Sequence, residues 1–214
     1  MVDPAEREAI LRRALTYPYA VPESSYLFRD GRVEELPEEP DLEGRAPLIS
    51  YGANAAPEAL ALKLAPLPAE PLPVIRSQLH GFDVVYSAHV SPYGAVPATL
   101  HESPGTVAPV FVLHPTAEQR ALLTATELNY DLVRTGGAEA YRSKHGCLQL
   151  DGGPVALAAV RSRGRTLPEL DEPAVLERVR ARVEPELSLE EFVYACIERG
   201  GVKSLRIDAG RDGR

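Results

Sequence analysis

The sequence contains little cysteine, little positive charge and no long apolar run, and each shortage argues against a class of protein. Cys147 and Cys196 are the only two cysteines among 214 residues, a count typical of reduced thiols rather than of a disulfide framework. Lysine and arginine total 23 against 31 aspartates and glutamates, a formal net charge of −8, which argues against binding to nucleic acid. The sequence contains no run of about 18 apolar residues, the length that a membrane-spanning helix needs. No basic segment precedes an apolar one near the N-terminus, as it would in a signal peptide. We therefore expect a cytoplasmic protein without a nucleic-acid or membrane partner.

Motifs that would indicate a metal or another cofactor are also missing. The sequence has no P-loop, no dinucleotide-binding glycine motif and no G-x-S-x-G nucleophile motif. Its five histidines lack the spacing of a metal site, and they are His80, His89, His101, His114 and His145. We expect neither a metal nor another cofactor.

The order of apolar patterns predicts an α+β protein. Between residues 73 and 160, at least six strand-like runs are separated by glycine and proline turns, among them Gly81, Pro104–Gly105 and Gly136–Gly137. Only one clear helix, residues 115 to 127, interrupts these runs. This spacing predicts a mostly antiparallel sheet or a small barrel rather than regular βαβ units.

Helical patterns dominate both ends of the chain. Residues 3–17 predict a first helix, and two short strands around an Asp30–Gly31 turn follow it. Residues 173–183 and 188–199 predict two amphipathic helices. A hydrophobic share of 44% suffices for one core with appendages. The predicted parts are an N-terminal helix and hairpin (residues 1–46), a central barrel (residues 47–160) and a helical extension packed on it (residues 161–214).

The stretch PLISYGANAAPEAL, residues 47–60, combines a short apolar strand, a glycine loop and a helix start. Gly52 lets the backbone turn sharply, and the small residues 53–56 leave the N–H groups of the loop accessible to a ligand. Free N–H groups at a helix start attract carboxylates and oxyanions. The loop is therefore either an anion-binding loop or an ordinary connection between a strand and a helix.

Two carboxylates are candidates for acid–base chemistry. Glu127, in LLTATELNY, stands where a helix with inward-facing leucines gives way to a strand that starts near Tyr130. A carboxylate drawn partly into apolar surroundings is suited to exchange protons with an amine, whereas a glutamate at a helix end is more often solvated. Glu102, in ATLHESPG, is the second candidate, and the turn at residues 103–105 predicts an exposed position at a strand end.

These features together resemble the γ-glutamylcyclotransferase-like family, whose fold is a small mixed barrel with flanking helices. The family's Tyr-Gly-Ser-Asn loop after the first strand is matched, with one substitution, by Tyr51, Gly52, Ala53 and Asn54.

The later motifs of this family follow in the same order along residues 47–160. They are a Gly-aromatic strand like Gly81–Phe82, a segment like residues 93–100, and a strand like VAPVFVLHP that leads into a helix. In the family this helix ends at the catalytic glutamate. Glu127, with Tyr130 after it, matches that position.

The resemblance implies an enzyme that releases 5-oxoproline from a γ-glutamyl amine or peptide without a cofactor. Glu127 would take a proton from the α-amino group of the substrate. The freed amine would attack the γ-carbonyl carbon, and Glu127 would then protonate the departing nitrogen. The implied substrate-binding residues are Tyr51, Gly52, Ala53, Asn54 and Tyr130.

The chain departs from the family pattern at three positions. Ala53 replaces the loop serine and so removes a hydroxyl donor, while Thr124 and Leu128 stand where the family often has an acidic residue and a glycine. These departures keep a second hypothesis open, in which the same fold is a non-catalytic small-molecule binding or interaction domain. The sequence also leaves open the leaving group and the oligomeric state, a homodimer included.

Overall fold

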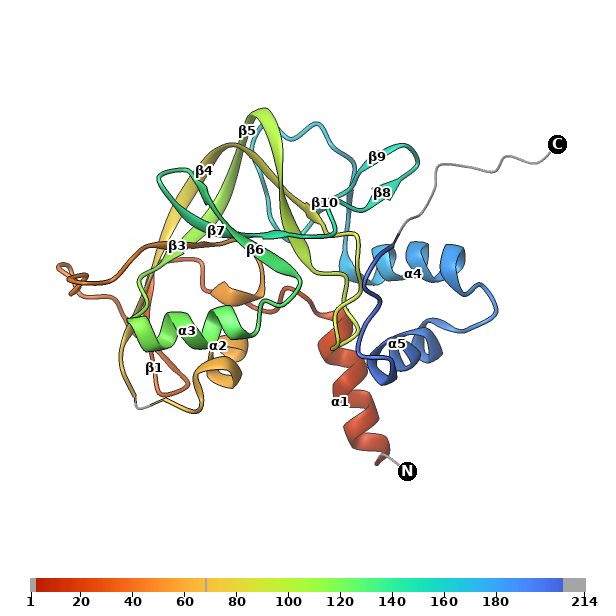
Figure 1. Ribbon diagram of the computed structural model, residues 1–214, viewed down its shortest axis with the longest axis horizontal. Coiled ribbons are helices and arrows are strands. Elements are labelled where there is room, and N and C mark those ends of the chain that lie inside the picture. Colours follow the sequence, from red (N-terminus) through yellow and green to blue (C-terminus); the bar gives the residue numbers. More distant parts are fainter. Residues whose placement is uncertain (1–2, 68, 206–214) are drawn as a thin grey trace.

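The computed structural model describes residues 3–67 and 69–205, and this part of the chain confirms an α+β protein with five α-helices and a largely antiparallel sheet (Figure 1). The predicted first helix, internal helix and two C-terminal helices are all present. The helices are α1 (Pro4–Leu15), α2 (Pro57–Leu64), α3 (Ala117–Ala125), α4 (Glu172–Val183) and α5 (Leu189–Glu198), with a single 3₁₀ turn, η1 (Ala53–Ala55), before α2.

Nine strands form the main sheet, and two short strands pair separately. The main path runs β11-β10-β4-β5-β3-β7-β6, and β1 and β2 are attached beside β4. The strands are β1 (Tyr26–Arg29), β2 (Arg32–Glu35), β3 (Leu48–Ser50), β4 (Leu72–Tyr86), β5 (Ala98–Leu113), β6 (Tyr130–Thr135), β7 (Ala138–Ser143), β8 (Gln149–Leu150), β9 (Gly153–Pro154), β10 (Ala156–Leu157) and β11 (Glu169–Leu170). Among the described residues, these pairings do not close into a barrel.

The two longest strands, β4 and β5, correct one expectation from the sequence. The turn residues at Gly81 and Pro104–Gly105 predict breaks between separate strands, but both strands continue past them. Gly81 has a φ of 78° and Gly105 a φ of 86°, and the pairing register shifts between His80 and Phe82. Glycine at positive φ lets a strand bend at such an irregularity without ending the ladder. Figure 1 shows β5 bending sharply at the top of the view.

The sheet joins all three predicted parts of the chain. From the N-terminal part, β1 pairs with β4 through Tyr26 and Val74. From the C-terminal part, β11 pairs in parallel with β10. Arg165 forms a two-pronged ion pair with the buried Asp83 of β4, with Nη2–Oδ1 and Nε–Oδ2 distances of 2.9 Å. The terminal segments therefore belong to the same structural unit as the central one, whichever way the predicted boundaries are drawn.

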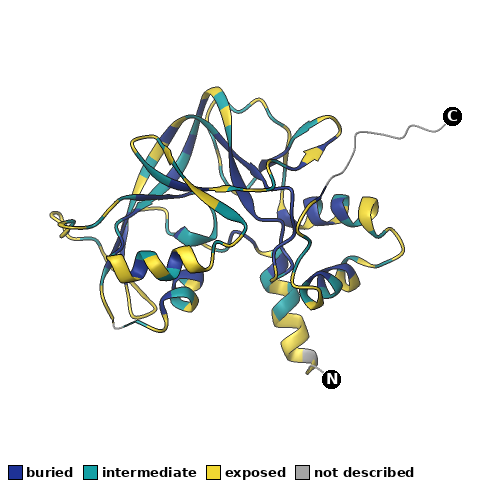
Figure 2. Cartoon of the chain, viewed as in Figure 1, coloured by how far each residue is buried: buried dark blue, intermediate teal, exposed yellow. Residues whose placement is uncertain are grey.

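Two apolar clusters fill the space around the sheet, and Figure 2 shows buried residues along the strands and on the inner faces of the helices. The larger cluster joins Tyr86 of β4 to Leu176 of α4 and Phe192 of α5. The smaller cluster joins Leu60 of α2 to Leu123 of α3. The helices therefore form two groups, α1 with α4 and α5, and α2 with α3. No helix among the described residues has both the length and the apolar character needed to cross a membrane.

The loop between β4 and β5, residues 87–97, is packed between α1, α4 and α5. Gly94 has a φ of 87°, and an added Cβ would lie 2.8 Å from Val193 Cγ1 of α5. At the start of α4, Glu172 Oε1 accepts a hydrogen bond from the Val96 N–H at 2.6 Å. Glu172 is only 2% exposed. Burial raises the pKa of Glu172 well above its ordinary value of 4.5. The hydrogen bond from Val96 lowers this pKa, and the nearby charge of Asp171 raises it further.

The buried Glu172 carboxyl makes the stability of the fold depend on pH. Between the ordinary pKa of 4.5 and the raised pKa of the folded state, the folded chain keeps a proton that the unfolded chain releases. The stability from this group is therefore complete below the ordinary pKa and is lost as the pH rises through the folded pKa, by at most about 1.4 kcal/mol per pH unit. We expect Glu172→Gln, which cannot titrate, to remove this part of the pH slope of the unfolding free energy, measured by urea denaturation. Glu186→Gln, at an exposed position, is the control, and an unchanged slope in Glu172→Gln would contradict the assignment.

Candidate functional site

One cavity of about 530 Å³ is lined by all six residues that the family resemblance assigns to the site. The loop Tyr51–Asn54 follows β3, Glu127 follows the last turn of α3, and Tyr130 begins β6. Asn54 and Glu127 are 73 positions apart in the sequence, yet their side chains are hydrogen-bonded. The fold therefore brings the two separately predicted features into one site.

Asn54, Lys63 and Glu127 form a polar cluster on the cavity wall, which we term the Glu127 cluster. Glu127 Oε1 accepts hydrogen bonds from Asn54 Nδ2 at 3.0 Å and from Lys63 Nζ at 2.8 Å. Lys63 Nζ also donates to Asn54 Oδ1 at 2.7 Å. The side chains of Lys63 and Glu127 are 21% and 13% exposed, so solvent screens this ion pair less than a surface pair. Glu127 is thus partly buried, and the solvated position that is more common for a glutamate at a helix end is not the one it takes.

The second oxygen of Glu127 has a different environment from the first. Both hydrogen bonds to the carboxylate end on Oε1, and no group of the described residues donates to Oε2. The carboxylate is therefore held in position through one oxygen, and the other oxygen is available to accept a proton.

Four tyrosines, Tyr17, Tyr51, Tyr93 and Tyr130, line the cavity together with Tyr141. Two of them are anchored on Ala98 at the start of β5. Tyr17 Oη accepts a hydrogen bond from the Ala98 N–H at 2.8 Å, and the Tyr130 hydroxyl donates to the Ala98 carbonyl at 2.9 Å. Burial raises the pKa of all four hydroxyls. They are therefore neutral at physiological pH and add polarity without charge.

Tyr51 both lines the cavity and packs in the fold. Its hydroxyl donates to the Tyr141 carbonyl oxygen, and its side chain packs against the larger apolar cluster. Tyr141 lies in β7, so this hydrogen bond connects the start of the loop to the strand that pairs with β3.

His89 contributes a neutral imidazole to the cavity. Burial, with the neighbouring His145, lowers the pKa of His89 to about 3. Its Nδ1 lies 2.6 Å from Ser87 Oγ, and its ring meets the Tyr130 ring edge to face at a centroid distance of 5.8 Å. Within residues 3–67 and 69–205, no group of three or more His, Cys, Asp or Glu side chains is arranged to hold a metal ion.

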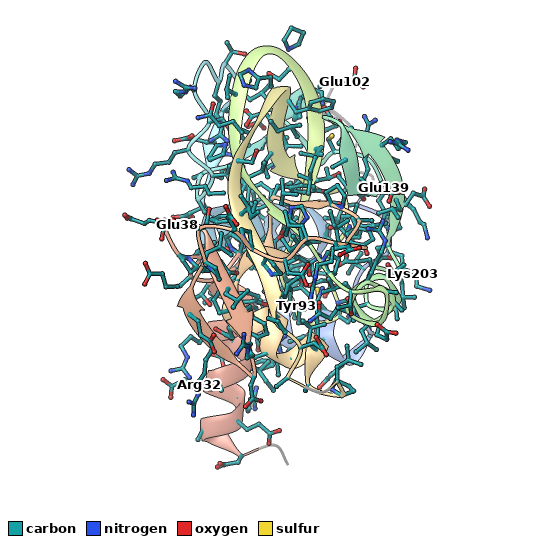
Figure 3. The ribbon with its side chains drawn as sticks, turned by 90° about the vertical axis from the view of Figure 1, so that its left-hand side faces the viewer. Arg32, Glu38, Tyr93, Glu102, Glu139 and Lys203 are labelled. Atoms are coloured by element: carbon teal, nitrogen blue, oxygen red, sulfur yellow. The ribbon has the colours of Figure 1, made fainter. Side chains whose placement is uncertain are left out.

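Glu102, the rival carboxylate, lies outside this cavity. Its side chain is 72% exposed and 3.8 Å from Arg142, so the expected exposure is confirmed. Its expected place at a strand end is wrong, because β5 continues past it. Figure 3 places Glu102 near the bend of the long strands, well away from Tyr93.

Several cavity residues have no role in the sequence-based prediction. Lys63 is the only basic residue in the apolar helix α2, and this isolation is the one signal that could have identified it. Tyr93 begins the segment that matches the family, but the resemblance assigns it no role. Arg13 and Tyr17 come from the N-terminal part, outside the resemblance. The N-terminal part therefore contributes to the cavity wall.

Comparisons of the chain with protein-family models, with curated proteins and with solved structures find no match.

Close packing between Gly52 and Tyr17 offers a test of the site geometry. A Cβ added at Gly52 would lie 2.6 Å from Tyr17 Oη, so we expect Gly52→Ala to cost about 1–3 kcal/mol of unfolding free energy. Tyr17→Phe alone leaves the Ala98 N–H without its acceptor, at a cost of about 1–3 kcal/mol. In the Tyr17→Phe background, however, the clash is gone and Gly52→Ala becomes nearly neutral.

A double-mutant cycle measured by chemical denaturation gives the coupling between the two changes. Gly153→Ala is the matched control, since a Cβ there meets no atom within 4 Å and its φ is not positive. An equal cost of Gly52→Ala in both backgrounds would show that the hydroxyl is not the obstacle.

Proposed function

We propose that this chain is a γ-glutamylcyclotransferase-like enzyme that releases 5-oxoproline from a γ-glutamyl amine or peptide. The observation that carries the proposal is the hydrogen bond between Asn54 and Glu127 in one cavity. Asn54 ends the loop that resembles the family's substrate loop, and Glu127 matches its catalytic glutamate. Two unrelated short matches would have no reason to meet at hydrogen-bond distance.

The chemistry needs one proton acceptor beside an amine that is held near a carbonyl carbon. Glu127 Oε2 takes a proton from the α-ammonium group, and the freed amine nitrogen forms a bond to the γ-carbonyl carbon of the same substrate while the carbonyl electron pair moves onto the oxygen. When this pair returns, the bond between that carbon and the leaving nitrogen breaks as Glu127 gives its proton to the leaving nitrogen. The second proton of the ring nitrogen passes to the released amine, which leaves as an ammonium. Asn54 and Lys63 keep the carboxylate in place throughout through Oε1.

Backbone groups of the loop support a role in substrate binding despite the loss of the serine hydroxyl at Ala53. The N–H groups of Ala55 and Ala56 are bonded to the carbonyl oxygens of Gly52 and Ala53. The N–H groups of Ala53 and Asn54 stand at the start of η1, where no preceding turn supplies an acceptor. In this proposal they hold the γ-glutamyl part of the substrate.

The proposal includes the closed barrel of the family. Two features support it, the bends of β4 and β5 and the contact between the segments that follow β4 and β7. Ser87 and Cys147 form an antiparallel bridge there, flanked by hydrogen bonds from Ala88 N to Gly146 O at 3.0 Å and from Leu148 N to Tyr86 O at 2.8 Å. This contact would join the two ends of the β4-β5-β3-β7 path.

Glu127→Gln tests the proposed base. The amide oxygen of glutamine can still accept hydrogen bonds from Asn54 and Lys63, but the side chain cannot take a proton. We expect the variant to fold cooperatively and to form 5-oxoproline at least about 100-fold more slowly. The measurement is mass spectrometry of 5-oxoproline after incubation with a panel of γ-glutamyl amines and dipeptides.

Glu102→Gln is the matched control, because it makes the same change at an exposed carboxylate outside the cavity. Full activity of Glu127→Gln would assign the base to another residue. A wild-type protein that binds the panel in calorimetry without forming 5-oxoproline would instead support the non-catalytic binding domain.

A further inference from the structure

Arg13 brings a second cation to the cavity from a helix outside the family resemblance. It lies in the last turn of α1, lines the cavity and is partly buried. Its Nε donates to Tyr19 Oη at 3.4 Å, and its guanidinium carbon lies 6.0 Å from the Tyr19 ring centroid and 5.6 Å from the Tyr93 ring centroid. The two rings hold the planar guanidinium group, while its terminal nitrogens remain available to a ligand.

The charges on the cavity wall do not balance. The charged residues that line it are Arg13, Lys63 and Glu127. Lys63 is paired with Glu127, whereas no carboxylate of the described residues forms an ion pair with Arg13. The cavity therefore carries one uncompensated positive charge in a chain whose net charge is −8. A partly buried charge of this kind is stabilised by an anionic ligand.

We propose that Arg13 binds a carboxylate on the leaving group of the substrate, and so selects γ-glutamyl amino acids and peptides over γ-glutamyl amines. This inference rests on the proposed function. A γ-glutamyl amine carries one ammonium and one carboxylate group and is neutral overall. A γ-glutamyl amino acid carries a further carboxylate, and its net negative charge balances the cavity. Guanidinium binds carboxylate through two parallel hydrogen bonds, which adds geometric selectivity to the charge.

The position of Arg13 indicates which carboxylate it binds. No hydrogen bond or ion pair of the described residues joins Arg13 to the Glu127 cluster, and α1 lies on a different side of the molecule from α2 and α3 (Figure 1). Glu127 has to face the α-amino group, and the α-carboxylate is attached to the same carbon as that amine. The leaving group continues away from the ring that forms, beyond the nitrogen that Glu127 protonates, and can therefore reach a wall outside the Glu127 cluster. The separate wall formed by Arg13 and Tyr93 is therefore assigned to the leaving group.

Two compounds isolate the leaving-group carboxylate. γ-Glutamyl-alanine and γ-glutamyl-ethylamine share the same γ-glutamyl part and differ only by the carboxylate of the leaving group. We expect the wild type to favour γ-glutamyl-alanine in kcat/KM by roughly 10- to 100-fold, the range for a hydrogen-bonded charged group. Arg13→Gln should bring this ratio close to one, because it raises KM for γ-glutamyl-alanine far more than KM for γ-glutamyl-ethylamine.

Two further variants separate charge from geometry and from helix effects. Arg13→Lys keeps the charge but loses the planar fork, so it should retain only part of the preference. Arg12→Gln removes a positive charge at the exposed neighbouring position on α1, and this variant should retain the full preference for γ-glutamyl-alanine. A loss of kcat/KM by the same factor for both compounds in Arg13→Gln would overturn the proposal, since it would indicate binding of the α-carboxylate or a packing role. An unchanged ratio would overturn it as well.

Failure of the proposed function gives a distinct result. If the wild type forms no 5-oxoproline from either compound, the cyclotransferase reaction is refuted, and calorimetric titration with the same compounds then tests Arg13 by itself. Tighter binding of γ-glutamyl-alanine that disappears in Arg13→Gln would support a carboxylate site at Arg13 without that reaction. Absence of binding for both compounds would refute the anion site too.

Discussion

The antiparallel pairing of β4 with β5 is the constraint on which the rest of the structure depends. The ladder runs from Val74–Leu113 to Tyr86–Ala98. Because buried N–H and C=O groups have to be paired, the other strands are positioned by the free edges of this ladder, β1 and β10 along β4 and β3 along β5. The loop that leaves β3 and the loop that joins β4 to β5 are thereby brought to the same cavity. Tyr17 and Tyr130 both form hydrogen bonds with Ala98 of β5, so the ladder also positions these two side chains of the cavity wall.

The terminal segments are part of the cavity and its support, and are not additions to a domain that is complete without them. From one side, α1 adds Arg13 and the turn after α1 adds Tyr17 to the cavity wall. From the other side, α4 and α5 hold the loop that carries Tyr93, through the Glu172–Val96 hydrogen bond and the contact of Val193 with Gly94. The buried Glu172 carboxyl, whose pKa is raised by burial, links the stability of the loop to pH. The substrate preference proposed for this site therefore arises from parts of the chain that lie outside the family resemblance.

Local patterns were sufficient to predict most elements of this fold. The helices follow from apolar residues repeated at three and four positions with caps such as Thr116, which accepts a hydrogen bond from the Gln119 N–H. The Asp30–Gly31 turn follows from backbone preferences alone, since both residues adopt positive φ. The predicted breaks at Gly81 and Gly105 failed because a glycine turn and a glycine bend inside a strand have the same local signature. Only pairing with the other strand distinguishes them. The strands β7 and β11 were missed as well, because AEAYRS and EL contain no continuous apolar run and become strands only through their partners.

The sequence by itself determined the fold class, the loop with its small residues and the acidic candidate Glu127, since these depend on residue type and spacing. Only the tertiary structure decided that Glu127 meets Asn54 and Lys63, and that Arg13 has no ion-pair partner among the described residues. Such outcomes depend on distances between residues far apart in the chain, and therefore on how the whole sheet bends and which helices cover it. Burial and charge balance are properties of that assembled environment, and no single segment of the sequence contains them.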